Sequence, residues 1–247
     1  MPRFLLTLLA TTIACASGSG PGTPIVPPPP PPSPDATSIL MLGNSLTYTQ
    51  DVPGMVADFA AAGGAPRPVV ASIAFANWSL EEHFNNDASR GAIDGGGFDV
   101  VVMQQGPSTL SSSRDHLILW SGRLRDLIVD AGSRGGLYAV WPPLGDDLEA
   151  GIMNYTDAAN QNSLALYPVA QAFREARRLD PTLPLTTSDN FHPTATGAAL
   201  AGMVIAATIF DQDPSGYPNP LPTVIDPDDM VTMRAAARYA VQTFGRR

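Results

Sequence analysis

The sequence predicts an α/β fold, a three-layer α/β/α sandwich around a doubly wound parallel sheet of about five strands. Short, uninterrupted apolar runs alternate along the chain with longer segments whose apolar residues recur every three or four positions. Continuous apolar runs are typical of strands that helices cover on both faces. Alternating strands and helices are typical of doubly wound sheets, which bind ligands at the carboxyl ends of their strands.

Five apolar segments are predicted as strands, and glycine or proline bounds most of them. In chain order they are Ile39–Leu42, Pro68–Ala74, Asp99–Gln104, Leu137–Trp141 and Leu164–Val169. The clearest is the third, because its four central residues are Val, Val, Val and Met. Gly43 ends the first strand and Pro142 stops the fourth.

Helices are predicted between these strands from apolar spacing and from capping residues. Asp51 begins the first helix, which ends at Gly63, and Ser79 begins a short one as part of a Ser-x-x-Glu capping box. The others are 112–131, 152–163, 170–178, 193–210 and one that begins at Asp226. Residues 47–50 and 91–97 are predicted as loops. With parallel strands in this order, the architecture is flavodoxin-like.

The N-terminus predicts export. Residues 1–15 form a predicted signal peptide, in which an apolar core at 4–13 is too short to span a bilayer. Residues 16–36 are rich in Ser, Gly and Pro, with six consecutive prolines at 27–32. Such a run favours a stiff polyproline II spacer. The remaining residues, 37–247, are predicted as one domain.

Cys15, the sole cysteine, admits two processing routes. Thr12-Ile13-Ala14-Cys15 resembles the lipobox of bacterial lipoproteins, which implies a lipid anchor at Cys15. Ala14-Cys15-Ala16 fits an ordinary Ala-x-Ala cleavage site instead. The sequence therefore predicts a periplasmic or cell-surface lipoprotein, or otherwise a secreted protein, and a single cysteine allows no intrachain disulfide.

The charge composition excludes some classes of binding partner. The 247 residues carry 14 basic and 23 acidic side chains, for a net charge of −9. An acidic surface argues against binding of nucleic acid, and it leaves membrane attachment to a lipid anchor alone. Glu81, Glu82 and His83 have no standard metal-ligand spacing, so we expect no metal and no cofactor. The oligomeric state is left open.

Two short stretches far apart in the sequence carry candidate chemistry. Gly43 ends an apolar strand and Ser45 follows at once, which is how α/β enzymes expose a nucleophile above a sheet. Asp189 and His192 place a carboxylate and an imidazole three positions apart. A serine needs a base, and the base needs a partner for its second ring nitrogen. We therefore predict a triad of Ser45 as nucleophile, His192 as base and Asp189 as its partner.

Both stretches resemble blocks of a known family. Gly43-Asn44-Ser45-Leu46-Thr47 is similar to the Gly-Asp-Ser-Leu block of the SGNH (GDSL-type) hydrolases, with Asn44 where that family usually has Asp. Asp189-x-x-His192 resembles the family's closing block. The likeness covers about residues 37–210 and implies a serine ester hydrolase that acts on small, acetyl-like acyl groups, with esters of a carbohydrate or of a lipid as the candidate substrates.

The same resemblance implies an oxyanion hole that departs from the family pattern. Ser45 supplies one backbone N–H. Asn77 takes the second position, where the family has Gly, and asparagine tolerates left-handed dihedrals better than most residues. The third position, an Asn in the family, falls to Ser108 or to the neighbouring amide of Gln105.

Four residues are candidates for the walls of a substrate pocket: Asn44, Trp78, His83 and Trp141. Two other functions are compatible with this fold. One is a non-catalytic, glycan-binding surface lipoprotein, which the altered oxyanion positions favour. The other is a flavin-binding module, which the hydroxyl-rich Thr47-Tyr48-Thr49 segment loosely favours but which leaves Asp189 and His192 without a role.

Overall fold

The computed structural model describes residues 35–246, all within the unit that spans Pro32–Arg247. The predicted signal peptide, the lipidation site at Cys15 and nearly all of the proline-rich linker lie outside the described residues. No helix within residues 35–246 has the length and apolar character needed to cross a membrane.

A five-stranded sheet, parallel throughout, forms the centre of the described chain. Its strands are β1 (Ser38–Gly43), β2 (Val69–Ala74), β3 (Val100–Met103), β4 (Arg134–Tyr138) and β5 (Ala165–Tyr167). Their order is β2-β1-β3-β4-β5, which confirms the predicted doubly wound sheet. The order reverses at β1, so the crevice between the ends of β1 and β3 is where such folds bind ligands.

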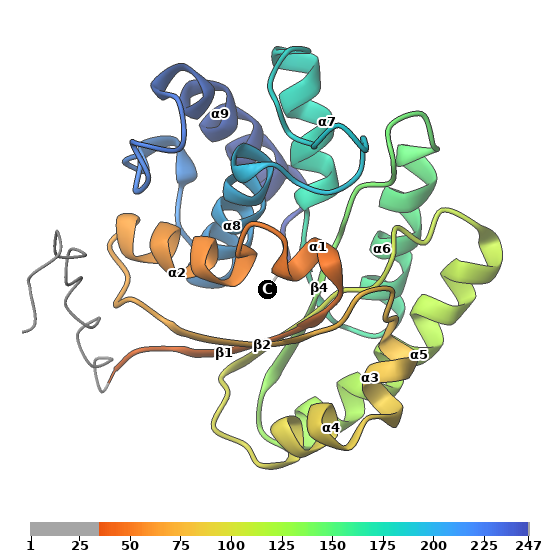
Figure 1. Ribbon diagram of the computed structural model, residues 1–247. Coiled ribbons are helices and arrows are strands. Elements are labelled where there is room, and N and C mark those ends of the chain that lie inside the picture. Colours follow the sequence, from red (N-terminus) through yellow and green to blue (C-terminus); the bar gives the residue numbers. More distant parts are fainter. Residues whose placement is uncertain (1–34, 247) are drawn as a thin grey trace, which may run out of the picture. The chain divides into compact units, whose positions relative to one another are not determined.

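Helices cover both faces of the sheet (Figure 1). They are α1 (Ser45–Tyr48), α2 (Val52–Ala62), α3 (Leu80–Asn85), α4 (Asp87–Asp94), α5 (Ser111–Asp130), α6 (Leu148–Gln161), α7 (Val169–Leu179), α8 (Ala195–Phe210) and α9 (Pro227–Phe244). In the view of Figure 1, α2, α8 and α9 lie above the sheet, and α3, α4 and α5 lie below it. The central strands are therefore buried on both faces: all four residues of β3 are fully covered.

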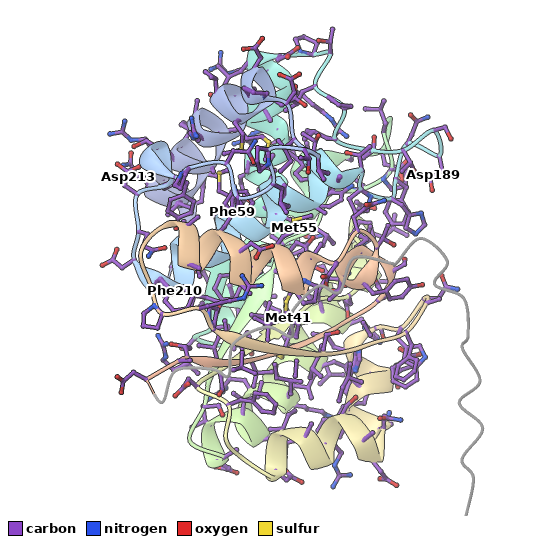
Figure 2. The ribbon with its side chains drawn as sticks, turned by 60° about the vertical axis from the view of Figure 1, so that its left-hand side comes forward. Met41, Met55, Phe59, Asp189, Phe210 and Asp213 are labelled. Carbon is purple, nitrogen blue, oxygen red and sulfur yellow. The ribbon has the colours of Figure 1, made fainter. Side chains whose placement is uncertain are left out.

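Packing between α2 and α8 sets the distance between the two predicted catalytic stretches. α2 follows the Ser45 turn and α8 follows His192. The two helices approach so closely that a Cβ on Gly202 would lie 2.4 Å from the Cβ of Met55. Figure 2 shows Met55 on α2. Asp189, before α8, lies on one side of that view, and Phe210, the last residue of α8, lies on the other. A close helix pair thus holds both stretches at one edge of the sheet.

The structure corrects three of the predicted boundaries. Residues 45–48 are a short helix rather than the start of a polar loop, because the Asn44 side chain caps it by accepting from the Leu46 N–H. Helix α4 occupies part of the predicted loop at 91–97 and has its own cap, Asn86. Strand β4 begins and ends three residues earlier than predicted.

Glycines explain the early start of β4. The ring of Tyr167 on β5 lies where a Cβ of Gly136 would be, at 2.5 Å, and Leu164 occupies the corresponding space at Gly135, at 2.9 Å. In a sequence, two consecutive glycines usually indicate a turn. Here they belong to the strand, where the absence of side chains lets neighbouring residues approach the backbone.

Candidate active site

Ser45 is the first residue of α1 and directly follows the end of β1. The Asn44 side chain joins two segments: its Oδ1 accepts from the Leu46 N–H at 3.1 Å, and its Nδ2 donates to the Trp78 carbonyl at 3.0 Å. The Ser45 N–H lies in the first turn of α1, where backbone N–H groups have no acceptor within the helix. The serine thus presents both a hydroxyl and a backbone donor at the carboxyl edge of the sheet.

The loop before α8 brings an imidazole to this serine. His192 Nε2 lies 2.9 Å from Ser45 Oγ, and His192 Nδ1 lies 2.6 Å from Asp189 Oδ2. A carboxylate oxygen only accepts, so Nδ1 carries the proton and Nε2 is left to accept from the serine hydroxyl. The structure therefore brings the three predicted residues into one hydrogen-bonded chain.

The Asp189 carboxylate is held on both oxygens. Its Oδ1 accepts from the Thr187 hydroxyl at 2.7 Å and from the N–H groups of Phe191 and His192, each at 2.9 Å. The hydrogen bond to His192, together with those from Phe191 and Thr187, keeps the pKa of this carboxyl well below its usual range. Asp189 is consequently an anion throughout the neutral range.

Trp141 supports the histidine loop from below rather than lining a pocket. Its indole is fully buried, stacks on Phe173 with ring centroids 3.6 Å apart, and donates Nε1–H to the Phe191 carbonyl at 2.9 Å. This placement corrects the expectation that Trp141 forms a pocket wall. A buried indole N–H usually has a hydrogen-bond partner. Here the partner is the carbonyl of Phe191, so a core residue fixes the backbone next to His192.

A pocket of about 400 Å³ opens beside Ser45. It is lined by Asn44, Ser45, Asn77, Trp78, Ser79, Gln105, Gly106, Pro107, Ser108, Ser113, His116 and Phe191. The predicted pocket residues Asn44 and Trp78 are among them. Phe75 is half-exposed and packs on Trp78, with ring centroids 4.2 Å apart, so an aromatic pair flanks the opening.

His83, in contrast, is fully buried and does not line this pocket. Its Nε2 lies 2.9 Å from the Gly43 carbonyl and its Nδ1 lies 2.9 Å from Ser89 Oγ. The prediction of His83 as a pocket residue is therefore wrong, because its ring is buried against the Gly43 carbonyl, beneath residues 43–47. Burial lowers the pKa of this imidazole.

The four residues that the family resemblance implies for the oxyanion positions, Ser45, Asn77, Gln105 and Ser108, all line the pocket. Asn77 adopts φ = 63°, in the left-handed region, and its backbone N–H makes no hydrogen bond within residues 35–246. Gln105 donates Nε2–H to Ser108 Oγ at 2.9 Å and accepts from the Leu80 N–H at 3.3 Å. The Gln105 amide and the Ser108 hydroxyl are thus bound to each other at the pocket wall.

Helix α6 fixes the loop that carries these two residues. The Tyr155 hydroxyl contacts the carbonyls of Gln105 and Gly106, at 3.0 and 3.1 Å, and the Asn154 amide donates to the Ser108 carbonyl at 2.6 Å. Ser108 itself has φ = 55°. The loop after β3 is therefore ordered by polar contacts from a neighbouring helix.

Sequence reasoning missed two polar residues of the site. His116 lines the pocket, and its Nε2 contacts Glu81 Oε2 at 2.9 Å. Its position in an amphipathic helix predicts only a surface or boundary residue. Gln104 is fully buried and contacts the Ser45 turn, whereas a glutamine at a strand end reads as solvent-facing. The sequence signal that could have indicated burial was the position of Gln104 at the end of a continuous apolar strand.

An α/β protein with a Ser–His–Asp hydrogen-bonded chain at the carboxyl ends of its strands has the features that define serine hydrolases. No protein-family model matches the sequence, and neither does any curated protein. Solved structures do match, and several of them are described as SGNH hydrolases, lipases or esterases. The resemblance read from the two short motifs is thereby confirmed, and the chain has the fold of the SGNH hydrolases.

Three of these structures show the extent of the likeness. A protein from Slackia heliotrinireducens, described as a candidate SGNH hydrolase, is 25% identical with a TM-score of 0.61, over 71% of this chain and 100% of that one. A DUF4886 family protein from Bacteroides uniformis is 17% identical with a TM-score of 0.68, over 85% and 96%. A lipase/acylhydrolase from Enterococcus faecalis is 17% identical with a TM-score of 0.51, over 70% and 95%.

Proposed function

We propose that this protein is an exported serine ester hydrolase that cleaves small acyl esters through an acyl-enzyme. The observation that carries the proposal is the chain of contacts from Ser45 Oγ to His192 Nε2 at 2.9 Å and from His192 Nδ1 to Asp189 Oδ2 at 2.6 Å. This order of nucleophile, base and carboxylate is what acyl transfer by serine requires.

In the proposed reaction, Ser45 Oγ attacks the ester carbonyl carbon while His192 Nε2 takes the hydroxyl proton. The carbon–oxygen bond to the alcohol then breaks, and His192 returns the proton to the leaving alkoxide. Water next attacks the acyl-serine, giving its proton to His192, which passes it to Ser45 Oγ as the carboxylic acid leaves. Asp189 remains an anion and stabilises the imidazolium in both halves.

Three donors are proposed for the oxyanion: the backbone N–H groups of Ser45 and Asn77 and the side-chain amide of Gln105. Asn77 lines the pocket in the left-handed conformation, and its N–H has no acceptor among the described residues. Gln105 uses Nε2 to donate to Ser108 Oγ and keeps a second N–H without an acceptor among the described residues. Loss of one such donor typically costs about 3 kcal/mol of transition-state stabilisation.

The pocket favours a short acyl group on a polar alcohol. Its walls carry hydroxyl, amide and imidazole groups from Ser79, Asn77 and His116, and the aromatic pair of Phe75 and Trp78 flanks it. A long acyl chain requires an extended apolar channel, whereas polar groups beside an aromatic face suit a sugar. We therefore propose an acetylated carbohydrate as the substrate class.

Export completes the proposal. The predicted signal peptide and a lipid anchor at Cys15 would place the enzyme in the periplasm or on the cell surface, and cleavage at Ala14-Cys15-Ala16 would instead release it. Metabolic labelling with a radioactive fatty acid tests the anchor: labelling of the wild type that is lost in Cys15→Ala supports it.

Turnover of p-nitrophenyl acetate by the purified protein tests the proposed function, with Ser45→Ala and His192→Ala for comparison. We expect measurable turnover by the wild type and a loss of at least about 10³-fold in each variant. Equal rates for all three proteins would refute the triad.

A non-catalytic glycan-binding role is the second candidate, and the Phe75–Trp78 pair motivates it. Calorimetry with an acetylated xylo-oligosaccharide separates the two functions. Tight binding without release of acetate favours the binding protein, whereas acetate release that depends on Ser45 favours the hydrolase.

A further inference from the structure

Three fully buried polar side chains, each from a different part of the fold, contact the segment 43–47 that contains Ser45. They are His83 on α3, Gln104 directly after β3, and Tyr138 at the end of β4. Each bonds a main-chain or side-chain group between Gly43 and Thr47. Burial of a polar side chain is costly unless the side chain is hydrogen-bonded. All three of these side chains have hydrogen-bond partners between Gly43 and Thr47.

Gln104 makes the most direct contacts. Its Oε1 accepts from the Asn44 N–H at 2.9 Å and from the Thr47 hydroxyl at 2.9 Å, and its Nε2 donates to the Gln105 carbonyl. A backbone N–H only donates, so the amide oxygen must face the turn, which fixes the orientation of the amide. The same side chain therefore bonds the residue before Ser45 and a residue of α1 after it.

His83 holds the carbonyl that ends β1. The Gly43 carbonyl only accepts, so the His83 Nε2 facing it carries the proton, and Nδ1 accepts from the Ser89 hydroxyl. Burial disfavours the charged imidazolium, so Nδ1 carries no second proton and the ring has a defined tautomer. Glu82 is the charged neighbour that affects it, and its attraction is outweighed by burial.

Tyr138 contacts α1 from the adjacent strand. Its hydroxyl donates to the Leu46 carbonyl at 3.3 Å, and the whole side chain is buried. Together the three side chains bond Gly43, Asn44, Leu46 and Thr47, which are four of the five residues from 43 to 47. None of the three side chains bonds Ser45, whose hydroxyl contacts His192 instead.

We infer that Gln104, His83 and Tyr138 are positioning residues that hold the Ser45 turn in its reactive geometry, with Gln104 the most important. The inference rests on the proposed function for its kinetic consequence. Groups that move by about 1 Å from a reactive arrangement can lose about 100-fold in rate. Loss of the Gln104 contacts should therefore lower the rate of attack by Ser45 while leaving substrate binding largely intact.

The key variant is Gln104→Leu, and Gln171→Leu is its matched control. Gln171 is also a fully buried glutamine, on α7, but neither of its amide atoms has a hydrogen-bond partner among the described residues. For p-nitrophenyl acetate we expect Gln104→Leu to lower kcat by about 10- to 100-fold with KM changed less than about twofold. Gln171→Leu should change neither constant by more than about twofold.

Two milder variants distinguish a loss of positioning from a folding defect in Gln104→Leu. Thr47→Val removes one of the two groups that donate to Gln104 Oε1, and we expect an intermediate loss of kcat. His83→Gln keeps an N–H donor for the Gly43 carbonyl, and it should retain more activity than His83→Leu. Folded Gln104→Leu and Thr47→Val proteins with the kcat of the wild type would overturn the inference.

Amide hydrogen exchange tests the same contacts without relying on activity. We expect Gln104→Leu to speed exchange of the Asn44 N–H by at least about tenfold relative to Gln171→Leu, because the buried acceptor of that N–H is lost. Unchanged exchange at Asn44 would contradict the positioning role. An inactive wild type with this exchange pattern would instead refute only the proposed hydrolase activity.

Discussion

His192 Nε2 lies 2.9 Å from Ser45 Oγ, although the two residues are separated by 147 positions in the sequence. The fold closes this separation by packing α2, which follows Ser45, against α8, which follows His192. Two glycines of α8 allow close packing. A Cβ on Gly202 would lie 2.4 Å from that of Met55 on α2, and a Cβ on Gly197 would lie 2.0 Å from the carbonyl oxygen of Leu185, in the segment that leads to His192. The site therefore depends on helix packing as well as on its own polar contacts.

The carboxylate behind the imidazole should be required for catalysis. Asp189→Asn keeps the size of the side chain but replaces an acceptor that faces His192 Nδ1–H, so it favours the wrong tautomer. We expect kcat for p-nitrophenyl acetate to fall by about 10²–10⁴-fold. Asp180→Asn is the control, since Asp180 also caps a turn, by accepting from Thr182. Equal losses in the two variants would argue against a specific role of Asp189.

Gly43 should tolerate no side chain. A Cβ there would lie 2.1 Å from Thr47 Oγ1 and 2.6 Å from Gln104 Oε1, so Gly43→Ala must displace the contacts beneath Ser45. We expect a loss of about 1–3 kcal/mol in the free energy of unfolding, measured with urea, together with reduced activity. Gly91→Ala, on α4, has open space around it and should be neutral or slightly stabilising. Similar stabilities for both variants would contradict the crowding at Gly43.

His83 should make stability depend on pH. Its pKa is lowered in the folded protein by burial from an ordinary value of 6.5, so the unfolded chain binds a proton more readily. The resulting stability is complete above pH 6.5 and decreases as the pH falls through the interval between 6.5 and the lower folded pKa. The slope cannot exceed about 1.4 kcal/mol per pH unit for one proton.

Urea unfolding at pH 7.5 and pH 5.5 measures this effect. Wild type should lose more stability between the two values than His83→Gln, which cannot titrate. His116→Gln serves as the control, because His116 is partly exposed beside Glu81. A wild type and a His83→Gln variant with the same change in stability would exclude the contribution.

His116 should recognise the alcohol part of a carbohydrate ester. It lines the pocket beside Ser45 and is held by Glu81 at 2.9 Å. Loss of one hydrogen bond to substrate is worth about 1–1.5 kcal/mol, so His116→Ala should raise KM for an acetylated xylo-oligosaccharide about tenfold. KM for p-nitrophenyl acetate, which lacks sugar hydroxyls, should change less than twofold. Equal effects on both substrates would indicate a general disturbance of the pocket.

Much of the architecture could be predicted from sequence, because strand burial leaves a strong pattern. The continuous apolar run of β3 and the alternation with amphipathic helices were sufficient for the parallel sheet. The Ser45 and Asp189–His192 segments could be recognised because each combines chemistry with a structural break. The short helix α1 was missed because its formation depends on the Asn44 cap rather than on apolar spacing.

The supporting residues could not be predicted, because their roles arise from tertiary contacts alone. His83 follows a capping box and reads as a polar residue near a pocket, yet it is buried beneath Gly43. Trp141 reads as a wall of the site, yet it stacks on Phe173 in the core and holds the Phe191 carbonyl. No local pattern distinguishes a buried polar side chain with distant partners from an exposed one.

Covalent labelling by an alkyl fluorophosphonate, followed by mass spectrometry of the labelled peptide, tests most directly whether His192 activates Ser45. We predict one adduct per chain on Ser45, a labelling rate reduced at least about 10³-fold in His192→Ala, and an unchanged rate in Ser113→Ala, whose serine also lines the pocket. Labelling at another residue, or equal rates in wild type and His192→Ala, would contradict the account.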